Sequence, residues 1–263
     1  MNEAQNPFTD GQGYERLMGR WTQPVGRQFL DWLGLPQGLR WLDVGCGNGA
    51  FTEVLLARCA PAAVSAIDPS EGQLAYARVR PGAKAAEFRQ GDAQALPYPD
   101  ASFDAVTMAL AITFVPDAAK AVREMARVAR PGGMVATYMW DLEGGGMPLE
   151  PLFASMRAVG VPLALPQGLA AARLDRLREL WQSAGLEAVE TRVFRATVRF
   201  ADFDDFWDSN TLQVGPAGKS IAQQPPATVA RLKSHARDIV PRQADGSITY
   251  EAWANAVKGR TRG

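Results

Sequence analysis

The sequence predicts an α/β fold in which a doubly wound, mostly parallel sheet of seven strands carries helices on both faces. Short apolar runs alternate with longer amphipathic segments over the first half of the chain, the pattern of strand–helix–strand units. The strand-like runs are almost entirely apolar, as expected for parallel strands that are covered on both sides. The 263 residues suffice for one large domain, and a hydrophobic content of 47% suffices for its core.

The first half of the chain contains five predicted strands, at residues 41–44, 63–67, 86–90, 105–109 and 134–139. Helices are predicted before and between them, at residues 25–33, 52–59, 71–78 and 118–128. The Pro131-Gly132-Gly133 sequence predicts a turn that separates the last of these helices from the fifth strand.

The second half is predicted to complete the sheet. A helix is expected at 174–184 and a long strand at 186–200, where the apolar positions change parity near Val193 and Phe194 and so predict a bulge or bend. A further helix is expected at 228–239 and the last strand at 247–258. We expect one domain over 1–263, divided into an N-terminal helical cap (1–35), a core (36–200 and 244–263) and an inserted lid (201–243).

The composition excludes several classes of protein. Lys and Arg number 28, as do Asp and Glu, so the chain lacks the basic excess of a nucleic-acid-binding surface. Cys46 and Cys59 match neither a metal-binding pattern nor a disulfide framework, so we expect no metal and reduced thiols. No apolar run approaches membrane-spanning length and no signal-peptide layout is present, so we expect a cytoplasmic protein without a membrane segment.

Three glycines, Gly45, Gly47 and Gly49, follow directly on the first predicted strand. Ligands of open parallel sheets sit at this end of the strands, and glycine lets the backbone approach them closely. The spacing up to Ala50 also satisfies the loose dinucleotide fingerprint, with Asp68 as the acid that binds a ribose. A nicotinamide- or flavin-dependent oxidoreductase is therefore one alternative, and a plain tight turn is another.

Three features favour a ligand without phosphate. Asp43, two residues before Gly45, would repel a pyrophosphate and attract an α-ammonium group, either directly or through water. The Gly91-Asp92-Ala93 sequence follows the third strand, and a carboxylate there can accept a hydrogen bond from the exocyclic amine of an adenine. No Ser/Tyr/Lys or His/Asp pair is placed for hydride transfer. A ligand with an amino-acid end, a ribose and an adenine fits these features, and S-adenosylmethionine has this composition.

With these residues the chain resembles the class I (Rossmann-like) S-adenosylmethionine-dependent methyltransferases, in particular the small-molecule branch related to quinone-biosynthesis methyltransferases. Four stretches in order carry the resemblance: LDVGCGNG, AIDPSEGQLAYAR, GDAQALPYPDASFDAV and ARPGGMVATY. The N-terminal YERLMGRW resembles the segment that closes over the cofactor in this branch. The resemblance also implies that the last strand is antiparallel and inserted between the fifth and the sixth.

The resemblance implies S-adenosyl-L-methionine as cofactor, S-adenosyl-L-homocysteine as product, and a set of binding residues. Asp68 would hold both ribose hydroxyls, and Asp92 and Ala93 would lie beside the adenine. The full set comprises Tyr14, Met18, Arg20, Asp43, Gly45, Cys46, Gly47, Asp68, Pro69, Gln73, Gly91, Asp92, Ala93 and Ala109. Two positions depart from the family pattern: Gln73 stands where Met is frequent, and ALAITFVPD lacks the histidines found in many relatives.

Methyl transfer by in-line displacement mainly requires that the protein align the reactants and exclude water. Aromatic side chains suit a sulfonium, and the candidates for a substrate wall are Phe114, Trp140, Phe203, Phe206 and Trp207, although core packing explains any single one better. Candidate bases are Asp141, Asp204, Asp205, Asp208 and His235, and the sequence assigns a catalytic role to none of them.

The expected partner is a small-molecule methyl acceptor, and the expected state is a monomer or a homodimer. A protein that binds the cofactor without transferring its methyl group is the alternative from another functional class.

Overall fold

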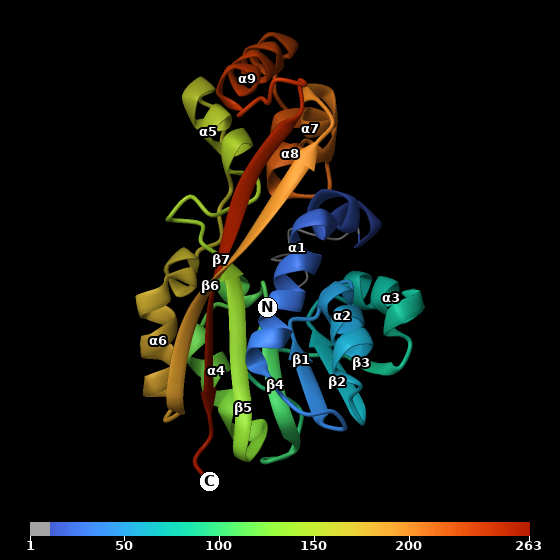
Figure 1. The fold of residues 1–263 in the computed structure, drawn as a ribbon, viewed down its shortest axis with the longest axis vertical. Coiled ribbons are helices and arrows are strands. Elements are labelled where there is room, and N and C mark those ends of the chain that lie inside the picture. The colour runs from blue at the N-terminus through green and yellow to red at the C-terminus, as the bar shows by residue number, and fades with distance from the viewer. Residues whose placement is uncertain (1–10) are drawn as a thin grey trace.

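The computed structural model of the protein describes residues 11–263, with side chains from Leu17 onward. One seven-stranded sheet, with the strand order β3-β2-β1-β4-β5-β7-β6, forms its centre (Figure 1). The strands are β1 (Arg40–Val44), β2 (Ala63–Asp68), β3 (Ala86–Gln90), β4 (Phe103–Ala109), β5 (Ala129–Trp140), β6 (Glu187–Phe200) and β7 (Ile248–Arg260). The first five are parallel, and β7 runs antiparallel to both β5 and β6. The predicted sheet is confirmed, including the last strand between the fifth and the sixth.

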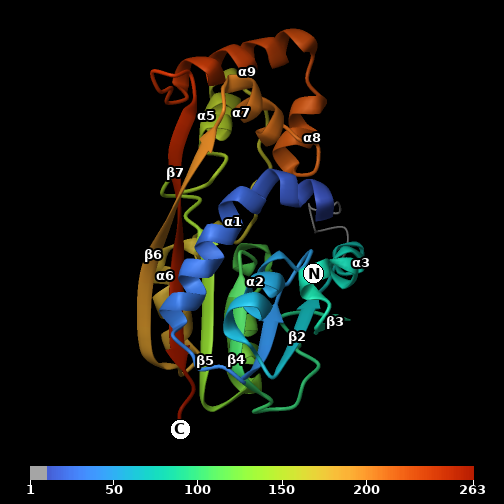
Figure 2. The ribbon, with the colours of Figure 1, turned by 45° about the vertical axis from the view of Figure 1, so that its right-hand side comes forward.

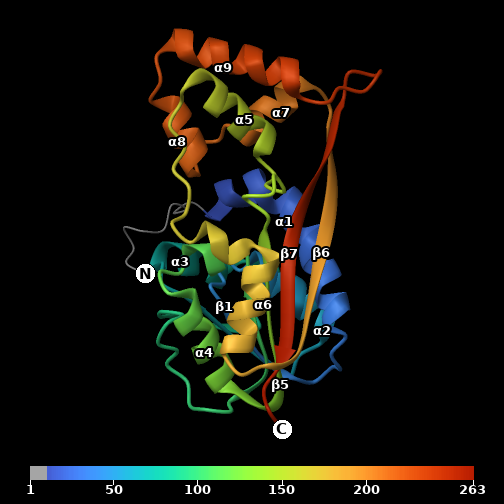
Figure 3. The same cartoon turned by 90° about the vertical axis from the view of Figure 1, so that its left-hand side faces the viewer.

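Helices cover both faces of the sheet (Figures 2 and 3). One face carries α1 (Gly11–Leu33), α2 (Ala50–Cys59) and α3 (Glu71–Val79), and the other carries α4 (Ala118–Val128) and α6 (Leu174–Ser183). Alternate side chains of the strands feed two separate cores: Trp41 and Ala136 pack in the core under α1, whereas Leu42 and Val135 pack in the core under α4 and α6. The nearly continuous apolar strands thus reflect burial on both sides. Three short 3-10 helices, η2 (Pro81–Ala83), η3 (Ile112–Phe114) and η4 (Leu169–Ala172), lie in the connections.

Four further helices form a group at one end of the molecule, which we call the cap (Figure 1). The cap consists of α5 (Glu150–Val159), α7 (Phe203–Asn210), α8 (Pro216–Ala222) and α9 (Pro226–Ile239). The long strands β6 and β7 extend from the sheet to this group. The stretch expected as a lid, 201–243, supplies three of these helices, but α5, which packs against α9, comes from the connection after β5 and was not predicted.

The N-terminal helix α1 is longer than its predicted part, 25–33, and it continues through Pro24. A proline inside a helix removes one backbone hydrogen bond and disfavours the preceding turn. Here Trp21, Val25 and Phe29 are fully buried along one face of the helix, and this burial outweighs the local preference. No helix among residues 11–263 is long and apolar enough to cross a bilayer.

The bulge predicted near Val193 and Phe194 is wrong. The pairing of β6 with β7 is unbroken from Glu190 to Phe200, and the irregularity lies between Glu187 and Glu190, where Ala188 has a φ of 49°. The apolar positions change parity because helices on opposite faces of the sheet cover the two halves of β6. Near its start β6 packs against α6, whereas from Phe194 onward its buried side chains face α1 and α7.

The turn predicted at Pro131-Gly132-Gly133 lies inside β5, which already begins at Ala129. The register between β4 and β5 shifts there, from Phe103 opposite Ala129 to Ala105 opposite Met134. The extra residues are accommodated as an irregularity in which Gly132 has a φ of 72°. The glycine-rich sequence thus lies in an irregular first part of β5 and not in a turn before it. The strand is therefore six residues longer than expected.

The indole of Trp181 on α6 joins the helix layer to the sheet, because its Nε1 donates to the Val135 carbonyl oxygen at 2.9 Å. We expect Trp181→Phe to lower the free energy of unfolding by about 1–2 kcal/mol more than Trp41→Phe does. Trp41 is a matched control, since it is equally buried but its Nε1 has no hydrogen-bond partner among the described residues. Chemical denaturation of both variants measures the difference, and equal losses would contradict the role of the hydrogen bond.

Candidate functional site

An open pocket lies at the carboxyl ends of the parallel strands. The loops that follow β1, β2, β3 and β4 contribute to its walls, and α1 covers one side. Ten of the fourteen predicted binding residues line it: Gly45, Cys46, Gly47, Asp68, Pro69, Gln73, Gly91, Asp92, Ala93 and Ala109. The sequence motifs therefore converge on one pocket, although they are spread over about 65 residues of sequence.

The backbone of the first glycine loop is fixed against β2. The amides of Gly45 and Cys46 both donate to the Ile67 carbonyl oxygen, at 2.7 and 3.1 Å. Gly45 has a φ of 71°, and a Cβ at this position would lie 2.6 Å from the Cβ of Ala111. Only glycine fits both the conformation and the space, so the loop can run close to a ligand.

Asp68 ends β2 at the floor of the pocket. Its Oδ2 accepts a hydrogen bond from the Gly47 amide and its Oδ1 accepts one from the Ser70 amide, both at 2.9 Å. Burial raises the pKa of Asp68, while these two backbone hydrogen bonds act in the opposite direction. Each oxygen keeps a free lone-pair direction, so the fixed carboxylate can accept hydrogen bonds from two neighbouring hydroxyls, as a ribose diol presents them.

Asp92 lies at the same rim, on the loop after β3. Gln94 holds its carboxylate with the backbone amide at 2.9 Å and with the side-chain Nε2, which is 3.1 Å from each oxygen. A Cβ on the preceding Gly91 would lie 2.5 Å from Ile67 Cδ1, so any other residue there would displace the Ile67 side chain. The sequence analysis did not identify Gln94 as a partner of Asp92. An aspartate carboxylate that accepts from the backbone amide two residues later is a common turn pattern, and this pattern is the signal that could have identified it.

Asp43 does not line the pocket. Its side chain is fully buried behind the glycine loop, where Oδ2 accepts a hydrogen bond from Thr52 Oγ1 at 2.7 Å. Burial raises the pKa of this carboxyl from 3.8 to about 7; the Thr52 hydrogen bond opposes the shift and the nearby Asp68 carboxylate adds to it. The side chain points into the protein interior, so Asp43 offers no direct contact to an ammonium group in the pocket, and the contact through water stays a prediction.

The predicted contacts from the N-terminal segment are distributed differently. Met18 faces a second pocket, and Arg20 turns toward α7, with Nη2 3.7 Å from Asp205 Oδ1 and the guanidinium 4.7 Å from the centre of the Phe200 ring. The side chain of Tyr14 lies outside the described residues. Thr22 and Gln23 line the first pocket instead. Their place one helical turn beyond Met18 is the signal that could have identified them.

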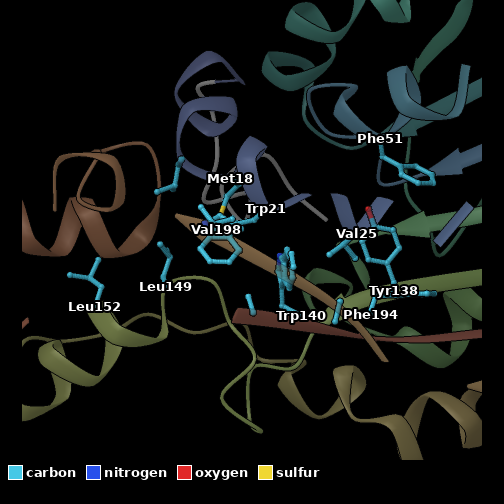
Figure 4. Close-up of a cluster of buried hydrophobic side chains, with 14 of the residues drawn as sticks. Met18, Trp21, Val25, Phe51, Tyr138, Trp140, Leu149, Leu152, Phe194 and Val198 are labelled. Atoms are coloured by element: carbon cyan, nitrogen blue, oxygen red, sulfur yellow. The ribbon is translucent and has the colours of Figure 1, made fainter. Parts of the chain in front are cut away.

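The second pocket, of about 730 Å³, adjoins the first and shares Leu110 and Phe114 with it. It lies between α1, the end of β5 and the cap, and Met18, Trp140 and Leu149 from these parts belong to one buried cluster (Figure 4). Leu110, between the two pockets, has a φ of 57°. A bulky residue with this backbone conformation is rare and strained, and such strain is concentrated at functional sites.

The proposed wall and base residues separate into two groups. Phe114 and Trp140 line the second pocket, whereas Phe203, Phe206 and Trp207 are buried in the packing of the cap. None of the five candidate bases lines either pocket.

Each base candidate is placed elsewhere. Asp204 lies 3.2 Å from Lys233 Nζ, and Asp205 is engaged by Arg20 and Ser209. Asp141 accepts from the Gly144 amide and Trp253 Nε1, and the His235 ring nitrogen Nδ1 lies 3.1 Å from Ser155 Oγ. Asp208 is exposed on α7. Within residues 11–263, no three His, Cys, Asp or Glu side chains gather as a metal site.

The pocket and the fold define an α/β protein of the doubly wound type with a nucleoside-sized site at the strand ends. A sequence profile of the family described as a methyltransferase domain matches residues 42–137. The demethylmenaquinone methyltransferase of Staphylococcus aureus is 36% identical over 136 residues, 51% of this chain and 54% of that protein. An uncharacterized protein of Mycobacterium tuberculosis is 32% identical over 121 residues, 46% of this chain and 44% of that protein. This chain therefore spans about half the length of the curated relatives that it matches.

Solved structures share the fold. The YcgJ protein of Bacillus subtilis has a TM-score of 0.60 and 20% identity, over 90% of this chain and 98% of that one. Phosphoethanolamine N-methyltransferase 2 of Haemonchus contortus, in complex with S-adenosyl-L-methionine, has a TM-score of 0.57 and 19% identity, over 96% of this chain and 57% of that one. The match over residues 42–137 and the shared fold agree with the resemblance to the S-adenosylmethionine-dependent methyltransferases that the sequence motifs carry.

The buried Asp43 predicts a pH dependence of stability. Its pKa in the folded protein, about 7, exceeds the value of 3.8 for the exposed group, so ionisation penalises the folded state. The penalty is absent below about pH 4, grows as the pH rises to 7 and is constant above that. We expect Asp43→Asn, which keeps the acceptor for Thr52, to gain roughly 2–3 kcal/mol of stability relative to the wild type between pH 5 and pH 8. Urea denaturation at both pH values measures this gain, and an unchanged difference would show that Asp43 stays ionised in the fold.

Proposed function

We propose that this protein is an S-adenosylmethionine-dependent methyltransferase that transfers a methyl group to a small-molecule acceptor by in-line displacement. The observation that carries the proposal is the fixed carboxylate of Asp68, held by the Gly47 and Ser70 amides at the floor of a pocket whose glycine loop admits a ligand at close range. This arrangement suits a ribose diol next to an uncharged linkage.

The residues that line the first pocket fit the parts of the cofactor. Asp68 would accept hydrogen bonds from the ribose hydroxyls, and Asp92, oriented by Gln94, would accept one from the exocyclic amine of the adenine. Thr22 on α1 adds a hydroxyl that has no hydrogen-bond partner among the described residues, although it lines the pocket. A buried hydroxyl without a partner favours a ligand that supplies one.

The bound cofactor supplies an electrophilic methyl group on a sulfonium. In an in-line displacement, the S–CH₃ bond would break as the bond from the acceptor atom to the methyl carbon formed, and the sulfur would leave as a neutral thioether. The chain contributes orientation and exclusion of water, which together can supply about 7–11 kcal/mol of the barrier reduction in favourable cases. Leu110 and Phe114, which belong to both pockets, form the apolar wall at which the two reactants would meet.

No side chain among the described residues of the second pocket is placed to act as a general base. The acceptor would therefore attack through a lone pair that needs no deprotonation by the protein, and any proton on the acceptor atom would leave to water. The name of the S. aureus relative, a demethylmenaquinone methyltransferase, supports a small-molecule acceptor for this chain.

Calorimetric titration with S-adenosylmethionine, S-adenosylhomocysteine and NAD, each against ligand-free protein, tests the proposal. We expect the first two to bind and NAD not to bind. Asp68→Ala should weaken the binding of both adenosyl ligands by at least about tenfold, because the ribose loses two charge-assisted hydrogen bonds. Asp175→Ala is the control, since Asp175 is exposed on α6 and pairs with Arg173 away from both pockets.

A thermal melt followed by circular dichroism shows whether each variant keeps the fold. Asp68→Asn preserves the shape of the side chain and one acceptor oxygen, so it separates the loss of ribose hydrogen bonds from a rearrangement of the loops. Binding of NAD alone would replace the proposal by a nicotinamide-dependent oxidoreductase. Binding of S-adenosylmethionine with no turnover of any acceptor in a broad panel would leave a non-catalytic binding protein.

A further inference from the structure

The second pocket has a position that suits the methyl acceptor. It is separated from the first pocket only by residues that belong to both, of which Leu110 carries the strained backbone. Residues of α8 and of the connection around Leu165 also line the pocket, and Leu165, which is 44% exposed, lies where the pocket meets solvent. A molecule seated there would therefore contact the cofactor pocket at one end and solvent at the other.

The walls of this pocket carry no charge. No Asp, Glu, Lys, Arg or His occurs among its nineteen described lining residues, and eighteen of them are apolar or glycine. A charged group that enters such a site loses its hydration without gaining a partner, which is strongly unfavourable. The pocket therefore selects against phosphorylated, carboxylate-bearing and ammonium-bearing molecules.

Among the described lining residues, one carries a side-chain amide: Asn210, the last residue of α7, which is 2% exposed. Its Nδ2 donates to the Phe206 carbonyl oxygen at 2.7 Å, and this bond fixes the orientation of the side chain. Its Oδ1 has no hydrogen-bond partner among the residues that the structure describes, and the same is true of Nε1 of Trp140, which also lines the pocket. Buried polar atoms are rarely left unpaired, so a ligand that offers a donor to one and an acceptor to the other is favoured.

We propose that the second pocket binds the methyl acceptor, and that the acceptor is an uncharged, largely apolar molecule whose hydroxyl or amino group donates to Oδ1 of Asn210. An oxygen of the same molecule can accept from Nε1 of Trp140. This inference rests on the proposed methyltransferase function, and it adds the chemical class of the acceptor and the residue that selects it.

Three 2-substituted naphthalenes distinguish the effect of hydrogen-bond donation from the effect of charge. 2-Naphthol is neutral and donates a hydrogen bond, whereas 2-methoxynaphthalene is neutral and only accepts. 2-Naphthoate is an anion at neutral pH. Each is titrated calorimetrically into the full-length protein saturated with S-adenosylhomocysteine, so that the first pocket is occupied. We expect 2-naphthol to bind at least about fivefold more tightly than 2-methoxynaphthalene, because only 2-naphthol satisfies Asn210. The anion should bind at least about tenfold more weakly than 2-naphthol.

Asn210→Leu should reduce the preference for 2-naphthol over 2-methoxynaphthalene to less than about twofold. Asn255→Leu is the matched control and should keep the full preference. Asn255 is equally buried on β7, its Nδ2 also donates to a backbone carbonyl, and its Oδ1 also lacks a partner among the described residues, but it lines neither pocket.

The outcomes are distinguishable. If the protein binds S-adenosylhomocysteine but not 2-naphthol, or if 2-naphthoate binds as tightly as 2-naphthol, the acceptor class is overturned while the proposed function stands. A preference that persists in Asn210→Leu overturns the role of that residue. Failure to bind S-adenosylhomocysteine overturns the proposed function itself. The comparison of the three probes on the wild-type protein remains decisive even if Asn210→Leu does not fold.

Discussion

The carboxylate of Asp68 is the interaction on which the site depends. One oxygen accepts from the amide of Gly47 in the loop after β1, and the other accepts from the amide of Ser70 at the start of α3. The same group therefore ties two neighbouring loops together and forms the floor of the pocket between them. The glycines on either side are constrained by this arrangement, because a side chain at Gly45 would strike Ala111 and one at Gly91 would strike Ile67. The residue that we propose to bind the ribose thus also fixes the two loops around it, which preorganises the site.

The first pocket and the second, apolar pocket are built by different layers of the molecule. The first is formed by strand ends and their loops, which the hydrogen-bond ladder of the sheet holds rigid. The second is formed by helices of the cap together with α1, which contributes Leu17 and Met18 to one pocket and Thr22 to the other. A single helix thus spans both sites, and its contact with α7 through Arg20 and Asp205 joins it to the cap. Since surface ion pairs contribute little stability, the buried face of α1 and not this pair holds the helix in place.

The strands of the sheet and most residues that line the first pocket could be predicted from the sequence, because apolar runs, glycines and acids at strand ends are local signals. Ten predicted residues meet at the pocket for this reason. The place of the last strand in the sheet came from the family resemblance. The failures involve tertiary context. The parity change in β6 results from helices covering opposite faces, and Met18, Arg20 and Asp43 are directed by packing that spacing does not encode. The helix α5 and the amide of Asn210 lack any motif, and only the folded chain brings them to the second pocket.

The cap is joined to the sheet through the paired strands β6 and β7, whose ladder is continuous from Glu190 to Phe200, and through the connection that leads to α5. This layout makes the molecule modular. Under the proposed function, insertions or substitutions between Phe200 and Ile248 would alter the second pocket without disturbing the loops of the first. A lineage with this architecture could then change its acceptor while the first pocket stays intact, and the paired strands β6 and β7 would be the connection that permits such exchange.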